Sequence, residues 1–127
     1  MHAQKELKIL LVEDNKINQR LATITFNQLE LKCDIASNGK EAFEMYQQNE
    51  YDLILMDLQM PVMNGLEATR LIRVFEKESD LQHRVFIVAL TASEISEKKE
   101  ECREAGMDDF MEKPIRGNML HTLISQF

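Results

Sequence analysis

The sequence predicts a single α/β domain in which five parallel strands form a sheet with helices on both faces. Short apolar runs alternate along the chain with amphipathic stretches, and this alternation is typical of parallel strands joined by crossover helices. The strongest runs are apolar at nearly every position, as expected for strands that are covered on both faces. The 127 residues suit one domain, which we expect to span 1–127.

The first predicted strand is the apolar run LKILLV at residues 7–12. The stretch that follows carries Ile17, Leu21 and Ile24 at spacings of four and three, which predicts a helix with these residues on one apolar face. KCDIA, at residues 32–36, is a weaker second strand.

The middle of the chain repeats this alternation. A second helix opens at Gly39 and carries Ala42, Phe43 and Tyr46, and the apolar run YDLILM at residues 51–56 is the third strand. Because this run is almost wholly apolar, we expect it to be buried.

A third helix is predicted to begin where Asn64 and Glu67 have the spacing of a capping box. Its buried face is expected to include Ala68, Ile72 and Phe75. The run VFIVAL at residues 85–90 is rich in β-branched residues and is therefore the fourth strand.

The last third of the chain contains a polar helix, a short strand and an apolar helix. The polar helix is SEISEKKEECREAG, residues 93–106, with Gly106 as its stop signal. MDDFME at residues 107–112 is the fifth strand, and a helix follows Pro114. That helix places four apolar residues on one side: Leu120, Leu123, Ile124 and Phe127.

The charge of the chain excludes several kinds of partner. With 15 Lys and Arg against 22 Asp and Glu, the net charge is −7. An acidic surface disfavours nucleic acid and anionic lipid, and no apolar stretch approaches the roughly 20 residues that span a bilayer. We therefore expect a cytoplasmic domain that contacts neither nucleic acid nor membrane. Cys33 and Cys102 are expected to be reduced and packed.

Polar residues follow four of the five predicted strands. Glu13 and Asp14 end the first strand, Asp57 the third, Thr91 the fourth and Lys113 the fifth. In an open parallel sheet, ligands bind beyond the carboxyl ends of the strands, so these side chains should converge there.

Three carboxylates in one place repel one another, and a hard divalent cation such as Mg²⁺ would relieve that repulsion. Glu13 and Asp14 could instead simply cap the first helix, where acids are favourable. Capping alone leaves Asp57 and Lys113 unexplained.

The same residue types suit phosphoryl transfer. A carboxylate oxygen of Asp57 can attack a phosphoryl group and carry it as an acyl phosphate. The transferring group spreads negative charge over its oxygens, which Mg²⁺, the Lys113 ammonium and the Thr91 hydroxyl could stabilise.

Four stretches in this order resemble the receiver domain of two-component response regulators: LLVEDNKINQ, LILMDLQMPVMNGLEATRLIR, VALTA and GMDDFMEKPI. The resemblance covers essentially the whole chain. It implies a flavodoxin-like, CheY-like fold, a doubly wound five-stranded parallel sheet with strand order 2-1-3-4-5 and five helices.

The resemblance also implies roles for the site residues. Asp57 is the expected phosphoacceptor, and Mg²⁺, which Mn²⁺ could replace, is expected to bind Asp14, Asp57 and the backbone carbonyl of Gln59. Glu13 would act on the metal through water. By the same resemblance, Thr91 and Lys113 would contact the phosphoryl oxygens, and the bond before Pro114 would be cis. Thr91 and Phe110 would be the switch residues that move on phosphorylation. Gln59 and Ser93 would tune the lifetime of the phosphoryl group, and Gly65 matches the glycine that follows the loop after the acceptor. Phe110 could equally be an ordinary core residue.

A receiver implies a histidine kinase or a histidine phosphotransfer protein as the phosphodonor. Asp14-Asn15 followed by Asn18-Gln19, together with MNGLEATRLIR and ALTA, resembles receivers of hybrid sensor histidine kinases. We therefore expect the chain to be part of such a protein, in the cytoplasmic portion of a sensor that could be membrane-bound. A stand-alone response regulator is the alternative, and a pseudo-receiver that only binds proteins is a further one. Homodimerisation could use the fourth helix, fifth strand and fifth helix.

As an isolated domain, we expect a switch that catalyses only its own phosphorylation and dephosphorylation, although the parent protein could be a kinase. A phosphatase of the haloacid-dehalogenase type also uses a strand-end Asp, but it requires a second Asp two residues later, where this chain has Gln59. A flavin carrier on this fold requires a phosphate-binding loop after the first strand, where the acidic EDNKIN would repel phosphate.

Overall fold

In the computed structural model, residues 6–80, 83–91 and 99–127 are described. Five strands form one parallel sheet in the order β2-β1-β3-β4-β5, which confirms the predicted topology. The strands are β1 (Ile9–Val12), β2 (Asp34–Ala36), β3 (Leu53–Asp57), β4 (Phe86–Thr91) and β5 (Asp109–Glu112). The helices are α1 (Lys16–Gln28), α2 (Gly39–Gln48), α3 (Gly65–Glu78), α4 (Lys99–Ala105) and α5 (Gly117–Ile124).

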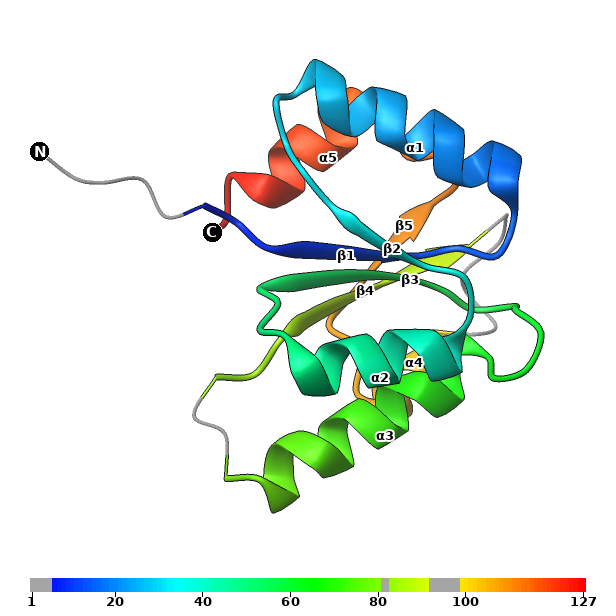
Figure 1. Cartoon of the computed structure of the whole chain (residues 1–127), viewed down its shortest axis with the longest axis vertical. Helices are drawn as coiled ribbons and strands as arrows, with labels where there is room; N and C mark the ends of the chain where they lie inside the picture. Colours follow the sequence, from blue (N-terminus) through cyan, green and yellow to red (C-terminus); the bar gives the residue numbers. More distant parts are fainter. Residues whose placement is uncertain (1–5, 81–82, 92–98) are drawn as a thin grey trace, which may run out of the picture.

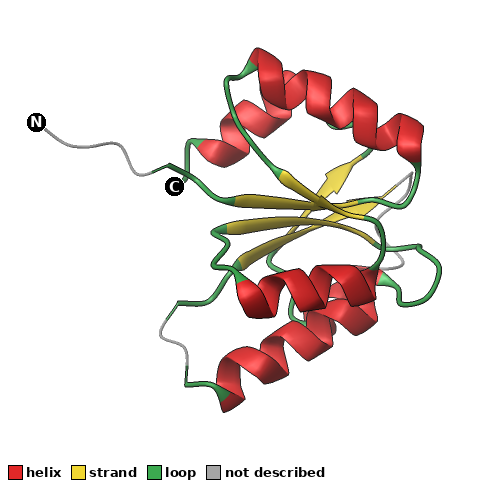
Figure 2. Cartoon of the chain, in the orientation of Figure 1, coloured by secondary structure: helices red, strands yellow, loops and turns green. Residues whose placement is uncertain are grey.

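The helices cover both faces of the sheet (Figure 1). α1 and α5 lie on one face, and α2, α3 and α4 lie on the other. Colouring by secondary structure makes the three layers plain (Figure 2). No helix in the described ranges has the length and apolar character that crossing a membrane requires.

The sheet separates two apolar clusters, which explains why the central strands are apolar at nearly every position. Along β1, Leu10 and Val12 belong to the cluster under α2 and α3, whereas Ile9 and Leu11 belong to the cluster under α1 and α5. Every residue of β3 is buried for the same reason. Successive side chains of a strand point to opposite faces, so a strand covered twice needs apolar residues at both parities.

The prediction located α1 correctly, but the apolar residues that suggested it face outward. Ile17, Leu21 and Ile24 are 70%, 50% and 50% exposed. The buried residues of α1 are instead Gln19, Ala22 and Phe26. Since α1 carries apolar residues on more than one face, spacing alone could not decide which face meets the sheet.

Asparagine caps define where three helices begin. The side-chain oxygens of Asn15, Asn38 and Asn64 each accept a backbone N–H three residues later, at 3.0, 2.8 and 2.9 Å. This arrangement satisfies one of the otherwise unpaired N–H groups of a helix start. The predicted cap at Asn64 is confirmed.

The structure also confirms the stop signal at Gly106. Its φ is 109°, and the N–H groups of Gly106 and Met107 both reach the carbonyl of Cys102 at the end of α4, at 3.2 and 3.0 Å. The predicted helix start at residues 93–98 lies outside the described residues. Contrary to a wholly polar character, α4 buries Cys102 and Ala105.

Candidate functional site

The five polar residues predicted at the strand ends come together at one edge of the sheet. The register pairs Val12 of β1 with Met56 of β3, so Glu13 and Asp57 follow side by side. Thr91 ends β4 and Lys113 directly follows β5. This edge is where the strand order reverses between β1 and β3, the expected position of a ligand site.

Three carboxylates dominate this edge. Glu13, Asp14 and Asp57 each offer an oxygen atom, and these atoms all lie within 4.8 Å of one another. Glu13 and Asp57 are only 3% and 5% exposed, whereas Asp14 is open to solvent. Buried like charges repel, and a set made wholly of oxygen donors matches the preference of Mg²⁺ or Mn²⁺.

Lys113 supplies the positive charge at this edge. Its Nζ lies 3.1 Å from Asp57 Oδ2 and 3.3 Å from Glu13 Oε1. Burial alone would lower the pKa of Lys113, but the carboxylates of Asp57 and Glu13 outweigh burial and the pKa is raised. The ammonium therefore stays charged at neutral pH and offsets one of the three carboxylates.

Thr91 ends β4 with a buried hydroxyl. The side chain is buried, and its Oγ1 has no hydrogen-bond partner within the described ranges. Its backbone carbonyl accepts the N–H of Lys113 at 2.6 Å, which couples the two residues. A buried hydroxyl without a partner is costly, and Thr91 remains a predicted phosphoryl contact.

The loop after Asp57 folds back over this residue. The N–H of Gln59 donates to Asp57 Oδ1 at 3.3 Å, and the N–H of Gly65 donates to the carbonyl of Leu58 at 3.1 Å. A Cβ on Gly65 would collide with the carbonyl oxygen of Asp57, so only glycine fits there. The carbonyl of Gln59 remains a predicted metal ligand.

The remaining predicted positions divide into three groups. The Lys113–Pro114 bond is cis, as predicted. Phe110 is half-buried against the α2–α3 cluster, and Lys99 Nζ lies 5.7 Å from its ring centroid; the structure therefore leaves both the core and the switch interpretation of Phe110 open. Ser93 lies outside the described residues.

Sequence reasoning missed Gln19. This residue is buried in α1, and its Nε2 donates to the backbone carbonyl of Glu13 at 2.6 Å. The Glu13 side chain also accepts the N–H of Asn15 at 3.1 Å. Together these bonds fix the turn that carries two of the carboxylates. The available signal was the spacing of Gln19 from Ala22 and Phe26, which places a polar group on a core face.

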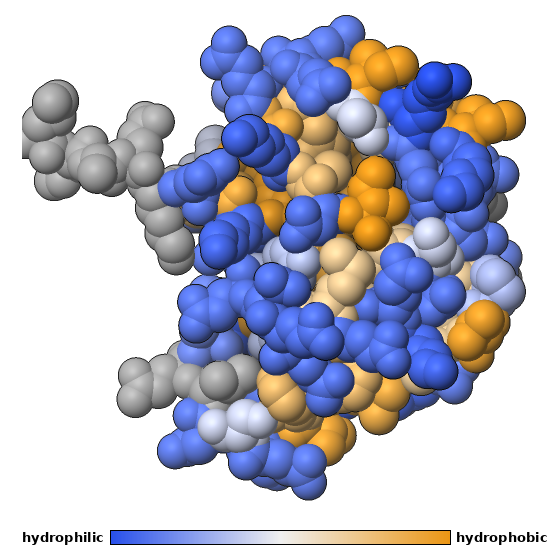
Figure 3. Space-filling model, in the orientation of Figure 1, coloured by the Kyte–Doolittle hydropathy of each residue, from blue (hydrophilic) through white to orange (hydrophobic). Residues whose placement is uncertain are grey.

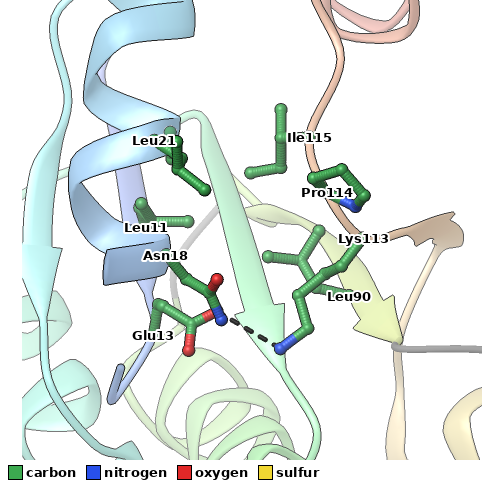
Figure 4. Close-up of a pocket in the computed structure, with 9 residues that line it drawn as sticks. Leu11, Glu13, Asn18, Leu21, Leu90, Lys113, Pro114 and Ile115 are labelled. Atoms are coloured by element: carbon green, nitrogen blue, oxygen red, sulfur yellow. Dashed lines mark hydrogen bonds and ion pairs between the residues drawn. The ribbon is translucent and has the colours of Figure 1, made fainter. Parts of the chain in front are cut away.

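A cavity of about 290 Å³ opens beside the site (Figure 4). Leu21 of α1 and Ile115 lie on opposite sides of it, and Glu13 and Lys113 lie at one end, joined by their ion pair. The exposed apolar side of α1 is therefore continuous with the residue that contacts Asp57.

Known proteins resemble this chain over nearly its whole length. The family model of the response regulator receiver domain matches residues 9–125. "Hybrid signal transduction histidine kinase F" of Dictyostelium discoideum is 39% identical over 120 residues, which cover 94% of this chain and 11% of that protein. The chain spans only 11% to 16% of the first histidine-kinase relatives.

Two solved structures show the same fold. The Saccharomyces cerevisiae receiver domain of Ssk1, in a co-crystal structure with the histidine phosphotransfer signaling protein Ypd1, has a TM-score of 0.83 and 36% identity, covering 95% of this chain and 86% of that one. The receiver domain of sensor histidine kinase PA1611 from Pseudomonas aeruginosa, with a magnesium ion coordinated in its active site cleft, has a TM-score of 0.82 and 35% identity, covering 96% and 97%.

Proposed function

Because this chain belongs to the response regulator receiver domain family, a family of phosphorelay signalling, we propose that it accepts a phosphoryl group on Asp57 and passes the signal on as a change of conformation. The observation that carries this proposal is the Thr91 hydroxyl, which is buried at the same edge as Asp57 and Lys113 and has no hydrogen-bond partner among the described residues. A site that served only stability would not leave a buried hydroxyl without an acceptor.

In the proposed reaction, a carboxylate oxygen of Asp57 attacks the phosphorus of a phosphohistidine. The P–N bond breaks, and the imidazole nitrogen leaves with the electron pair. Lys113 Nζ and the Thr91 hydroxyl donate to the phosphoryl oxygens as their charge develops. Water later attacks the same phosphorus, which releases phosphate and restores the carboxylate.

We propose that a divalent cation, Mg²⁺ or Mn²⁺, is held by Asp14, Asp57 and the Gln59 carbonyl, with Glu13 acting through water. Such a cation neutralises charge on the transferring group. The fit rests on the chemistry of the donors: three carboxylates within 4.8 Å, with one ammonium beside them, leave an excess of negative charge. The similar receiver domain of sensor histidine kinase PA1611, which has a magnesium ion coordinated in its active site cleft, supports the same assignment.

The phosphodonor is proposed to dock on the exposed face of α1. Ile17, Leu21 and Ile24 form this face, and the hydropathy surface shows orange patches over α1 among mostly hydrophilic atoms (Figure 3). Large exposed apolar residues grouped beside a site mark an interaction surface. The relative that is bound to a histidine phosphotransfer protein supports this class of partner.

Two parts of the proposal concern output and origin. Phosphorylation would draw Thr91 toward the phosphoryl group and Phe110 inward behind it, which would alter the α4–β5–α5 face and could promote a homodimer. We also propose that the domain belongs to a cytoplasmic part of a hybrid histidine kinase, because several of its relatives are hybrid signal transduction histidine kinases. Neither nucleic acid nor membrane is proposed as a partner of this domain.

The test compares two phosphodonors by intact mass. Incubation with acetyl phosphate and Mg²⁺ should add one phosphoryl group, and both Asp57→Asn and a chelator should abolish the adduct. Leu21→Glu should slow transfer from a phosphorylated phosphotransfer protein without slowing transfer from acetyl phosphate. Val74→Glu, at an exposed position on α3, is the control for added charge. An adduct that persists in Asp57→Asn would refute the acceptor assignment.

A further inference from the structure

The start of α2 makes a close contact with the loop that carries the proposed metal ligand. Gly39, the first residue of α2, is buried, and its N–H donates to the carbonyl of Met63 at 2.9 Å. Met63 lies in the loop of residues 58–64, which joins Asp57 to α3 and contains Gln59. A helix-start N–H has no partner within its own helix, so this single bond satisfies Gly39 and also holds the loop.

There is no room for a side chain at Gly39. A Cβ there would lie 2.5 Å from the Met63 carbonyl oxygen, 2.9 Å from the Asn64 carbonyl oxygen and 3.1 Å from Ala68 Cβ. The two nearest of these atoms are backbone carbonyl oxygens of the loop, and backbone atoms cannot rotate away as the end of a side chain can. A larger residue must therefore displace the loop or α2.

Two side-chain hydrogen bonds hold the start of α2 in place. The Asn38 side chain caps the helix by accepting from Glu41 at 2.8 Å, and the Glu41 carboxylate accepts the N–H of Ser37 at 3.2 Å. The loop, in contrast, turns through Val62 at φ 71°, with a bond of 2.8 Å from the N–H of Met63 to the carbonyl of Pro61. A positive φ at a β-branched residue is strained, so the loop is the part that gives way.

We infer that Gly39 is a positioning residue for the metal site, which holds the loop so that the Gln59 carbonyl reaches the cation. This inference rests on the proposed function. Mg²⁺ demands near-octahedral geometry at about 2.0–2.1 Å, so a small loop displacement is enough to weaken its binding. Residues that orient a metal ligand typically change affinity by about 10- to 100-fold when they are replaced.

The first test measures Mg²⁺ binding by titration calorimetry in three variants. Gly39→Ala should weaken Mg²⁺ binding by about 10-fold or more. Gly117→Ala is the matched control, because a Cβ at Gly117 meets nothing within 4 Å. Leu123→Ala, in the apolar cluster on the other face of the sheet, is the control for lost stability. Both controls should bind Mg²⁺ as the wild type does.

The second test needs no variant and so remains informative if Gly39→Ala does not fold. Coupling between two sites is reciprocal, so Mg²⁺ should slow hydrogen exchange of the Gly39 amide more than exchange of the Ala42 amide, which bonds to Asn38 within the same helix start. Equal slowing of both amides, or unchanged Mg²⁺ affinity in Gly39→Ala, would overturn the inference. A wild type that binds no Mg²⁺ would instead overturn the proposed metal site itself.

Discussion

Charged side chains gather at both edges of the sheet, but the two edges differ in how far those charges are paired with opposite charges. At the edge opposite the site, Arg73 bonds to Glu76 and to Asp108, each at 2.8 Å. Glu76 also accepts the Tyr46 hydroxyl at 2.7 Å and the N–H of Val85 at 2.8 Å. At the Asp57 edge, within the part of the chain that the structure describes, three carboxylates share one ammonium and the buried Thr91 hydroxyl has no partner.

This difference separates a stabilising network from a binding site. Buried polar groups that are fully paired fix the packing of the elements that carry them, and Arg73 ties α3 to the end of α4 through the Gly106 carbonyl at 2.9 Å. At the Asp57 edge, one ammonium offsets only part of the charge of three carboxylates among the described residues, and under the proposed function a bound cation offsets more of it. The contrast predicts opposite effects of mutation at the two edges.

The largest effect is expected at the paired edge. Glu76→Ala should lower the free energy of unfolding by about 2–4 kcal/mol, because it leaves the Tyr46 hydroxyl and the N–H of Val85 without the acceptor that each now has, while Arg73 keeps Asp108. Urea denaturation measures this loss. Glu78→Ala, at an exposed position of the same helix, should change it little. Equal losses in the two variants would mean that the network does not stabilise the fold.

At the site edge, Mg²⁺ should stabilise the fold. At a concentration ten times its dissociation constant, one bound ion adds about 1.4 kcal/mol to the free energy of unfolding. Asp14→Ala should remove this gain, because it removes a proposed ligand. The same urea curves, recorded with and without Mg²⁺, check this; an undiminished gain in Asp14→Ala would place the ion elsewhere.

Two buried threonines offer a matched pair of hydroxyls. Thr91 Oγ1 has no partner in residues 6–80, 83–91 and 99–127, whereas Thr69 Oγ1 donates to the Gly65 carbonyl at 2.8 Å. Thr69→Val should cost about 1 kcal/mol of stability, and Thr91→Val should be neutral or stabilising by a similar amount. Thermal unfolding of the two variants compares them directly, and a destabilised Thr91→Val would show that its hydroxyl is satisfied in the resting protein.

The smallest effect concerns alkaline pH at the paired edge. Burial, and then the hydrogen bond to Glu76, raise the pKa of Tyr46 above its ordinary value of 10.0. Above pH 10 the unfolded chain releases this proton while the fold retains it, so stability falls as pH rises toward the folded pKa and is unaffected below that range. Tyr46→Phe should therefore flatten the decline in the free energy of unfolding between pH 10 and 11. An unchanged slope would contradict the assignment to Tyr46.

The strands and the site residues could be predicted from sequence because each rests on a local pattern. Apolar runs located β1, β3 and β4, the alternation of segments placed the two weaker strands, and polar residues after four of the strands located the site, since topology brings strand ends together. The outward face of α1 could not be predicted, because Ile17 and Phe26 compete for the core and only the packed sheet decides between them. The Arg73 network was also hidden, because Arg73, Glu76 and Asp108 look like surface residues until distant segments meet.

The central claim is that Asp57 carries the phosphoryl group. Treatment of the phosphorylated protein with sodium borohydride reduces an acyl phosphate to an alcohol, so the acceptor residue is converted to homoserine and can be located by peptide mass mapping. The account predicts homoserine at position 57 alone, and only when Mg²⁺ was present during phosphorylation. Homoserine at Asp14, or a phosphoryl adduct that leaves Asp57 unmodified, would contradict it.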